Sequence, residues 1–170
     1  MKRFVFRHQP HASLKTSILA GVGAMLAVAA FGLLSDVSQT PWLFAPFAAT
    51  CVLIFGFPSS ALSQPANVIG GHMVSALIGL GLHLLLANHF AVAGLAVGLS
   101  ISVMMIARIA HPPAGATALV AYLTASNWMF LVMPVLTGSV ALVVMGMGYH
   151  LAVKAAYPHP LPVQSTTRSN

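Results

Sequence analysis

Acidic side chains are almost absent from this chain. Asp36 is the one Asp or Glu among 170 residues, and charged residues of both signs make up 5% of the chain. A soluble domain carries roughly a quarter of its residues as charged ones, so this composition cannot supply a water-facing surface. Hydrophobic residues make up 58%, and the mean hydropathy is +0.91. The composition therefore predicts a protein whose surface is covered mostly by lipid.

The shortage of acids and of cysteine also excludes several kinds of site. One acid cannot provide the paired carboxylates of acid–base catalysis. Cys51, the single cysteine, permits neither an internal disulfide nor a cysteine metal site. The sequence has no phosphate-binding glycine loop, and no serine or cysteine nucleophile with an acidic partner. Its histidines have neither acids nor cysteines to complete a metal site. We therefore expect no enzymatic activity, no cofactor and no bound metal.

Positive charge is concentrated at the start of the chain. The net charge is +6, and four basic residues precede the first apolar run: Lys2, Arg3, Arg7 and Lys15. Basic residues directly before an apolar run are typical of the cytoplasmic side of a membrane span, and four charges are few for a nucleic-acid arm. The run itself is longer than the apolar part of a signal peptide. We predict a cytoplasmic arm over residues 1–15, an uncleaved first helix and no nucleic-acid partner.

Long apolar runs predict helices that cross a membrane. Four runs have nearly the full length: 16–35, 68–87, 92–109 and 129–153. Two shorter runs, 44–57 and 112–124, hold about 14 residues or fewer; as helices they cover about 20 Å of a core about 30 Å thick. Pro46 and Pro113 suit helix starts, where the missing amide would be unpaired anyway. We predict an all-α membrane protein with four full transmembrane helices and two shorter, proline-started half-helices.

The sequence is internally duplicated. Residues 46–50 (PFAAT) correspond to 113–117 (PAGAT), and residues 79–83 (GLGLH) correspond to 146–150 (GMGYH). Both correspondences have the same offset of 67 residues, from Thr50 to Thr117 and from His83 to His150. Two separated matches at one offset predict repeats over about 16–88 and 91–154, and such repeats are common in transporters.

The direction of the repeats depends on the two half-helices. If they turn back within the membrane, the chain crosses four times and the repeats are parallel. If each half-helix completes a crossing with its flanking segment, there are six crossings and the repeats are inverted. We prefer six crossings, because only then does Arg108 lie on the cytoplasmic side with the basic arm.

The starts of the half-helices are candidate anion sites. Unpaired amides and the positive end of the helix dipole meet at a helix N-terminus. The first turns are small and end in threonine: Ala48, Ala49 and Thr50 in the first, and Gly115, Ala116 and Thr117 in the second. Small side chains let an anion reach the amides, and the hydroxyls can donate a further hydrogen bond. Alternatively, small residues only allow tight packing, with each threonine bonded back to its own helix.

Four histidines lie within or beside the predicted helices. His72 and His111, beside a glycine pair and a half-helix start, are candidates for adding positive potential to an anion site. His83 lies 11 residues after His72, on the same helix face, and we expect it to approach His150 around the duplication axis. His83 and His150 are candidates for proton coupling, although histidines near the ends of spans can also simply lie at the membrane interface.

Two segments of the sequence resemble a known family. Residues 111–119 (HPPAGATAL) and 64–72 (QPANVIGGH) are similar to the signature of the HPP family of small integral membrane proteins. The resemblance covers residues 16–157 and implies a compact helical membrane domain. Members in plastids and cyanobacteria are associated with nitrite transport. Asn67, in the second segment, joins the candidate binding residues, and Ala66 stands where members commonly have a basic residue.

These observations together predict a transporter or channel for a small monovalent anion, nitrite first, held between the half-helix starts. We expect the domain at 16–157, a short flexible tail at 158–170, and both termini in the cytoplasm of a bacterial cell whose inner membrane holds the protein. The lipid bilayer and the anion are the expected partners, and glycine-rich helix faces allow a homo-oligomer. The alternatives are a membrane module that senses or scaffolds without transport, and a path for a neutral species such as nitrous acid.

Overall fold

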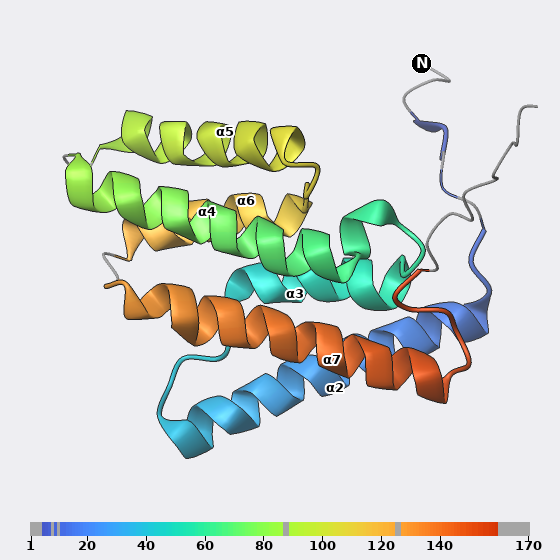
Figure 1. Ribbon diagram of the computed structural model, residues 1–170. Coiled ribbons are helices and arrows are strands. Elements are labelled where there is room, and N and C mark those ends of the chain that lie inside the picture. The colour runs from blue at the N-terminus through green and yellow to red at the C-terminus, as the bar shows by residue number, and fades with distance from the viewer. Residues whose placement is uncertain (1–4, 8, 10, 87–88, 125–126, 160–170) are drawn as a thin grey trace, which may run out of the picture.

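The computed structural model describes residues 5–7, 9, 11–86, 89–124 and 127–159, and its regular structure is helical with no strand in these ranges. Figure 1 shows the six α-helices of this part of the chain: α2 (Leu14–Ser38), α3 (Ala45–Cys51), α4 (Pro65–Leu85), α5 (Phe90–Ile106), α6 (Pro112–Leu123) and α7 (Thr137–Ala152). Short turns extend them: a π-helical turn follows α3 (Val52–Gly56), a 3-10 turn precedes α4 (Ala61–Ser63), and a second π-helical turn precedes α7 (Leu131–Leu136). The predictions for Lys2, Arg3, Ala87 and residues 160–170 lie outside the described residues.

Three helical stretches are long and apolar enough to cross a membrane: Leu14–Ser38, Pro65–Leu85 and Leu131–Ala152. They confirm the all-helical, membrane-spanning character expected from the composition. The run at 92–109, predicted as a full span, forms a shorter helix. This helix, α5, has 17 residues and covers about 26 Å. His89 caps its start by accepting a hydrogen bond from the Ala91 amide, and the left-handed backbone of Arg108 (φ 59°) turns the chain just beyond its end.

The two halves of the chain run in opposite directions. In Figure 1 each helix reverses the direction of the one before it, so that the equivalent helices α2 and α5, α3 and α6, and α4 and α7 run in opposite directions. This is the relation that inverted repeats require. The start of α2 and the end of α7 consequently lie at the same end of the bundle.

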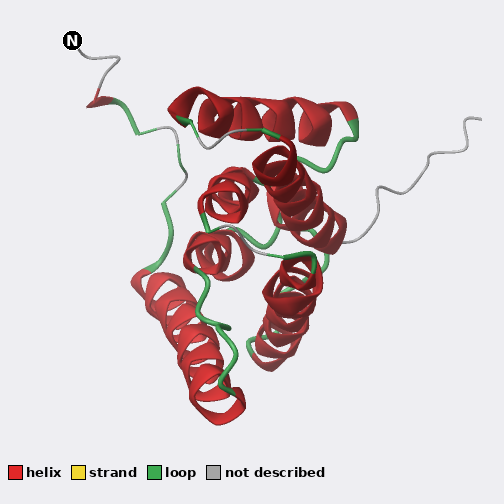
Figure 2. Cartoon of the chain, turned by 90° about the vertical axis from the view of Figure 1, so that its left-hand side faces the viewer, coloured by secondary structure: helices red, strands yellow, loops and turns green. Residues whose placement is uncertain are grey.

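The repeats are also intertwined. The third helix of each repeat packs against the first two helices of the other: α4 against α5 and α6, and α7 against α2 and α3. The end-on view in Figure 2 shows the helices gathered in this way into one bundle. Gly79 and Gly146, which the offset of 67 relates, permit close approaches between the repeats. A Cβ atom at Gly79 would collide with the Ala118 carbonyl, and one at Gly146 with the Ile54 side chain.

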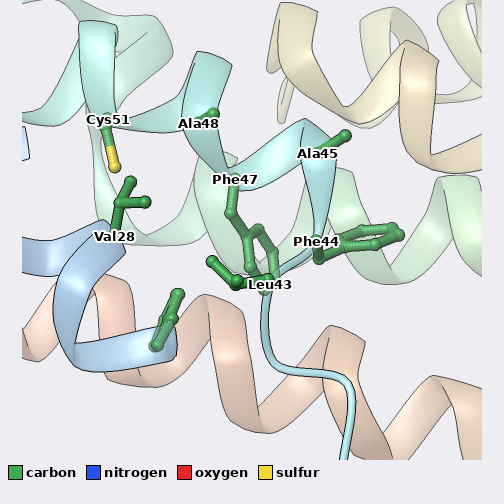
Figure 3. Close-up of a pocket in the computed structure, with 8 residues that line it drawn as sticks. Val28, Leu43, Phe44, Ala45, Phe47, Ala48 and Cys51 are labelled. Carbon is green, nitrogen blue, oxygen red and sulfur yellow. The ribbon is translucent and has the colours of Figure 1, made fainter. Parts of the chain in front are cut away.

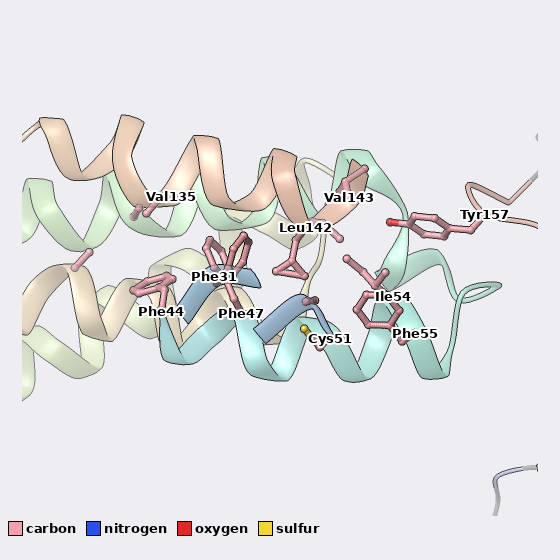
Figure 4. Close-up of a cluster of buried hydrophobic side chains, with 14 residues drawn as sticks. Phe31, Phe44, Phe47, Cys51, Ile54, Phe55, Val135, Leu142, Val143 and Tyr157 are labelled. Carbon is pink, nitrogen blue, oxygen red and sulfur yellow. The ribbon is translucent and has the colours of Figure 1, made fainter. Parts of the chain in front are cut away.

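An apolar core lies between α2, α3 and α7 (Figure 4). Phe47 of α3 is its central ring: the ring centroid lies 5.7 Å from that of Phe31 and 5.0 Å from that of Phe44. Its third ring neighbour is polar, because His72 of α4 meets it edge-on at 5.1 Å. The core therefore borders directly on a buried polar group.

Candidate functional site

Four polar side chains meet in the interior, where α3, α4 and the start of α6 approach one another. Thr50 comes from α3, His72 from α4, His111 from the residue that precedes α6, and Thr117 from α6. All four side chains are 0% exposed. Thr50 and Thr117 are equivalent residues of the two repeats, and the antiparallel packing of α3 and α6 brings their hydroxyls to opposite sides of one imidazole. We call these four residues the His–Thr cluster.

Hydrogen bonds join the cluster into a chain. The Thr50 Oγ1 atom lies 2.9 Å from His72 Nε2, and His72 Nδ1 lies 2.7 Å from Thr117 Oγ1. Thr50 Oγ1 is also 3.0 Å from His111 Nε2, and His111 Nδ1 is 2.7 Å from the carbonyl oxygen of Leu62. His72 therefore bridges the two equivalent threonines, and His111 connects them to the turn that precedes α4.

The carbonyl at one end fixes the direction of the hydrogen bonds. A carbonyl oxygen only accepts, so His111 Nδ1 carries a hydrogen and donates to Leu62. The Nε2 atom of a neutral His111 then accepts from the Thr50 hydroxyl. The Thr50 oxygen accepts from His72 Nε2, and His72 Nδ1 accepts from the Thr117 hydroxyl. Every ring nitrogen and hydroxyl has a partner when both imidazoles are neutral. The Pro46 carbonyl, 3.1 Å from Thr50 Oγ1, is a second acceptor for the Thr50 hydroxyl.

The cluster has no acidic partner. Asp36 is the only carboxylate side chain of the protein, and it is exposed near the end of α2. A proton taken up by His72 or His111 would therefore meet no opposite charge from a side chain. A buried imidazolium without such a partner is costly, and a small anion close to it would lower that cost.

Two cavities flank the cluster. One, of about 300 Å³, lies beside the start of α6 and is lined by Ile101, Met104, Met105, Ala110, His111, Pro112 and Gly115. The other, of about 220 Å³, lies beside the start of α3 and is lined by Val28, Phe31, Leu43, Phe44, Ala45, Phe47, Ala48 and Cys51. Figure 3 shows this second cavity, with Leu43, Phe44 and Phe47 gathered at the start of α3. We call them the α6 cavity and the α3 cavity.

The cavities are equivalent under the duplication. The residues of the α3 cavity at 43, 44, 45 and 48 are related by the offset of 67 to those of the α6 cavity at 110, 111, 112 and 115. Of the two cavities, the α6 cavity reaches an imidazole of the cluster. His111 itself lines the α6 cavity, whereas Phe47 lines the α3 cavity and places its ring edge against His72. One aromatic ring therefore separates the α3 cavity from the cluster.

The other candidate binding residues surround the cluster without joining it. The Asn67 amide donates to the carbonyl of Ala110 at 2.9 Å and so ties α4 to the segment before α6. Gly115 is partly buried beside the α6 cavity. Ala48, Ala49 and Ala116 are exposed, on helix faces turned away from the two buried threonines.

The first turns of the half-helices offer few unpaired amides. Pro112 and Pro113 have no N–H, and the Ala114 amide donates to the carbonyl of His111 at 2.9 Å. In α3, Pro46 has no N–H and the Phe47 amide donates to the carbonyl of Phe44 at 2.8 Å. The prolines that mark these helix starts in the sequence also remove the donors an anion would use there. The side chains of the cluster are therefore the more prominent polar groups near each start.

His83 and His150 do not approach one another, and that expectation was wrong. They lie in the last turns of α4 and α7, which Figure 1 places at opposite ends of the bundle because the repeats are inverted. The His83 ring centroid lies 6.0 Å from that of Tyr122, while His150 Nε2 donates to the Ile54 carbonyl at 2.8 Å. Their environments are separate.

Sequence reasoning missed Phe47 and Leu62. Phe47 faces His72 and the α3 cavity, and Leu62 supplies the carbonyl that orients His111. For Phe47 the sequence held a signal, because the repeats differ in side-chain size at this position: the equivalent residue of the second repeat is the small Ala114. For Leu62 none was present, since a backbone carbonyl leaves no trace in the side-chain pattern.

Comparison with known proteins places the chain among membrane proteins. A model of one family, described as HPP, transmembrane region, matches residues 9–158. Two transmembrane proteins of Dictyostelium discoideum are 37% and 36% identical to the chain over 130 and 129 residues. Each match covers 71% of this chain but 46% and 42% of the relatives, so the chain spans less than half of their length. No solved structure matches.

Proposed function

The chain belongs to the HPP family of integral membrane proteins, and on that premise we propose that it is a transporter or channel for a small monovalent anion, nitrite first. One observation carries the proposal: a buried, hydrogen-bonded polar cluster lies between two cavities that the inverted duplication relates. In lipid-embedded proteins, buried polar groups commonly mark the path of a substrate. Inverted repeats around a central site are typical of secondary transporters.

In the proposed arrangement all six described helices belong to the membrane domain. The three long stretches and α5 cross the membrane, while α3 and α6 act as half-helices that start at the two cavities. The chain then crosses six times, and both termini lie on the cytoplasmic side of a bacterial inner membrane. Arg108 and Lys154, each in a left-handed conformation just after its helix, face the cytoplasm in this topology.

The anion is proposed to bind at the α6 cavity. Moving an isolated ion from water into a low-dielectric interior costs on the order of 20 kcal/mol by the idealised Born estimate, so bare apolar walls would exclude it. His111 lines this cavity, and the ring centroid of His72 lies 5.0 Å from that of His111. Protonation of either ring supplies the positive charge that an anion requires. The volume of about 300 Å³ is far above the roughly 10–15 Å³ that a cavity needs to hold one water.

Flux through reconstituted protein tests this proposal. Proteoliposomes loaded with nitrite, nitrate, formate or chloride at two pH values should release nitrite faster than protein-free vesicles. His111→Ala and Thr117→Val should each lower the nitrite flux by at least tenfold while the protein remains folded. His11→Ala is the matched control, because His11 is exposed in the N-terminal arm, and it should transport normally.

The same assay can refute the proposal. Normal nitrite flux in both cluster variants would remove the proposed site. If no anion moves in vesicles in which a known transporter is active, the alternative of a sensing or scaffolding membrane module is favoured instead.

A further inference from the structure

We propose that His72, Thr50 and His111 relay a proton between the two cavities, so that each anion crosses together with one proton. The inference rests on the proposed anion transport and specifies its coupling. Its basis is the hydrogen-bond chain, in which one threonine hydroxyl joins two imidazoles at 2.9 and 3.0 Å. His111 lines the α6 cavity, and His72 is separated from the α3 cavity by the Phe47 ring.

The transfer balances over three groups. In the neutral state His72 carries its hydrogen on Nε2, and Thr50 donates its own hydrogen to His111 Nε2. When the Thr117 hydroxyl turns away from His72 Nδ1, a proton binds this nitrogen and the Nε2 hydrogen passes to the Thr50 oxygen. The original Thr50 hydrogen then moves to His111 Nε2. His72 ends neutral with its hydrogen on Nδ1, Thr50 is unchanged in composition, and His111 becomes an imidazolium.

The proton leaves on the other side. His111 Nδ1, which donates to the Leu62 carbonyl in the resting state, gives its hydrogen to water in the α6 cavity. His111 is then neutral again, with its remaining hydrogen on Nε2. One proton has entered at His72 and one has left at His111. Each ring then takes up one proton on its bare nitrogen and releases one from its other nitrogen to water on its own side, which restores both resting tautomers without net proton movement. Rotation of the Thr50 hydroxyl toward the Pro46 carbonyl, 3.1 Å away, breaks its hydrogen bond to His111 Nε2. The two imidazoles are then disconnected, and protons do not pass continuously.

Among the residues that the structure describes, no other ionisable side chain takes part in these hydrogen bonds. Helix α5 has no titratable residue. The titratable side chains on the other helices packed around the cluster are Lys15 and Asp36 on α2, Cys51 on α3, His83 on α4, Tyr122 on α6, and Tyr149 and His150 on α7. None of them bonds to His72, Thr50 or His111. The imidazolium at His111 therefore takes its counter-charge from the transported anion, and the coupled movement carries no net charge.

The test measures the number of protons that move with each anion. Proteoliposomes enclosing a pH-sensitive dye receive an inward gradient of nitrate, whose acid is strong and does not leak through lipid. Nitrite is measured in parallel, with the leak of protein-free vesicles subtracted. Wild-type protein should acidify the lumen by one proton per anion, and valinomycin with potassium should leave the flux unchanged. Thr50→Val should reduce proton movement at least tenfold, while Thr50→Ser, which keeps the hydroxyl, should retain it.

Each contrary result has a distinct meaning. If valinomycin accelerates the wild-type anion flux several-fold without acidification, the coupling is wrong while anion transport stands. If Thr50→Val keeps one proton per anion at the wild-type rate, the relay is wrong. Should Thr50→Val fail to fold, the valinomycin response of the wild-type protein still decides the coupling. Absence of flux for every anion would overturn the proposed function itself, and with it this inference.

Discussion

Replacing Thr117 with valine removes one hydroxyl from the His–Thr cluster and keeps nearly the same side-chain volume. Within the described residues this hydroxyl is the one donor to His72 Nδ1, at 2.7 Å, and both side chains are completely buried. A buried polar atom left without a partner costs about 1–3 kcal/mol. Polar contacts in transmembrane bundles average about 0.6 kcal/mol, because the unfolded helices also find partners. Because His72 is completely buried, we expect a value between these two, a loss of about 1–2 kcal/mol in the free energy of unfolding.

Thermal unfolding in detergent measures this loss. For a chain of this size, 1 kcal/mol shifts the Tm by about 2–4 °C, so Thr117→Val should lower the Tm by about 2–8 °C. Thr124→Val on the same helix is the matched control: Thr124 is exposed, and its hydroxyl bonds back to the carbonyl of Val120 at 2.9 Å. Its Tm should change by less than about 2 °C. Equal shifts for the two variants would refute the reasoning, because the bond to His72 would then contribute no more than a bond within the helix.

Three further predictions concern packing, access and pH. Gly79→Val should abolish folding, seen as loss of the monodisperse peak in size-exclusion chromatography, whereas Gly81→Ala, with open space at its Cβ, should behave as wild type. Phe47→Leu should raise anion flux in proteoliposomes, because the smaller side chain opens the α3 cavity toward His72; an unchanged flux would show that Phe47 is not the barrier. Burial raises the pKa of Tyr157, which lies beyond the last span, to about 12. The folded state therefore holds the Tyr157 proton more tightly than the unfolded state does. The Tm should fall as the pH rises from 10 to 12, and Tyr157→Phe should remove this pH dependence.

The helices were largely predictable because the apolar runs and their prolines mark them directly. The run at 68–87 corresponds to α4 at Pro65–Leu85, which begins earlier because Pro65 occupies the first helical position after Gln64. The run at 129–153 is less regular. A backbone kink at Met133 (φ −132°), next to Pro134, divides it before α7 begins. Hydrophobicity gives the extent of such a run, whereas a break in its hydrogen bonding depends on packing.

The members of the cluster were predictable individually, but their mutual contacts were not. Thr50 and Thr117 stood out through the duplication, and His72 and His111 through their rarity as polar groups in apolar surroundings. Nothing in the sequence showed that the two hydroxyls would meet one imidazole, because that depends on how closely α3, α4 and α6 pack. The approach expected for His83 and His150 failed for the same reason. Equivalent residues of an inverted repeat lie together only when they are close to the symmetry axis.

The divergence of the two repeats gives the hydrogen-bond chain its direction. With Thr50, His72 and Thr117 alone, the Thr50 hydroxyl could donate either to His72 or to the Pro46 carbonyl, and the direction would not be fixed. The offset of 67 relates His111 to Phe44, so Thr50 has a second imidazole as a partner, while the equivalent partner of Thr117 would be a ring that cannot accept a hydrogen bond at its edge. His111 is itself held as a donor to the Leu62 carbonyl, and the order of donors then follows back to Thr117. Duplication supplies two equivalent cavities, and the exchange of phenylalanine for histidine makes the hydrogen-bond chain of the cluster directional.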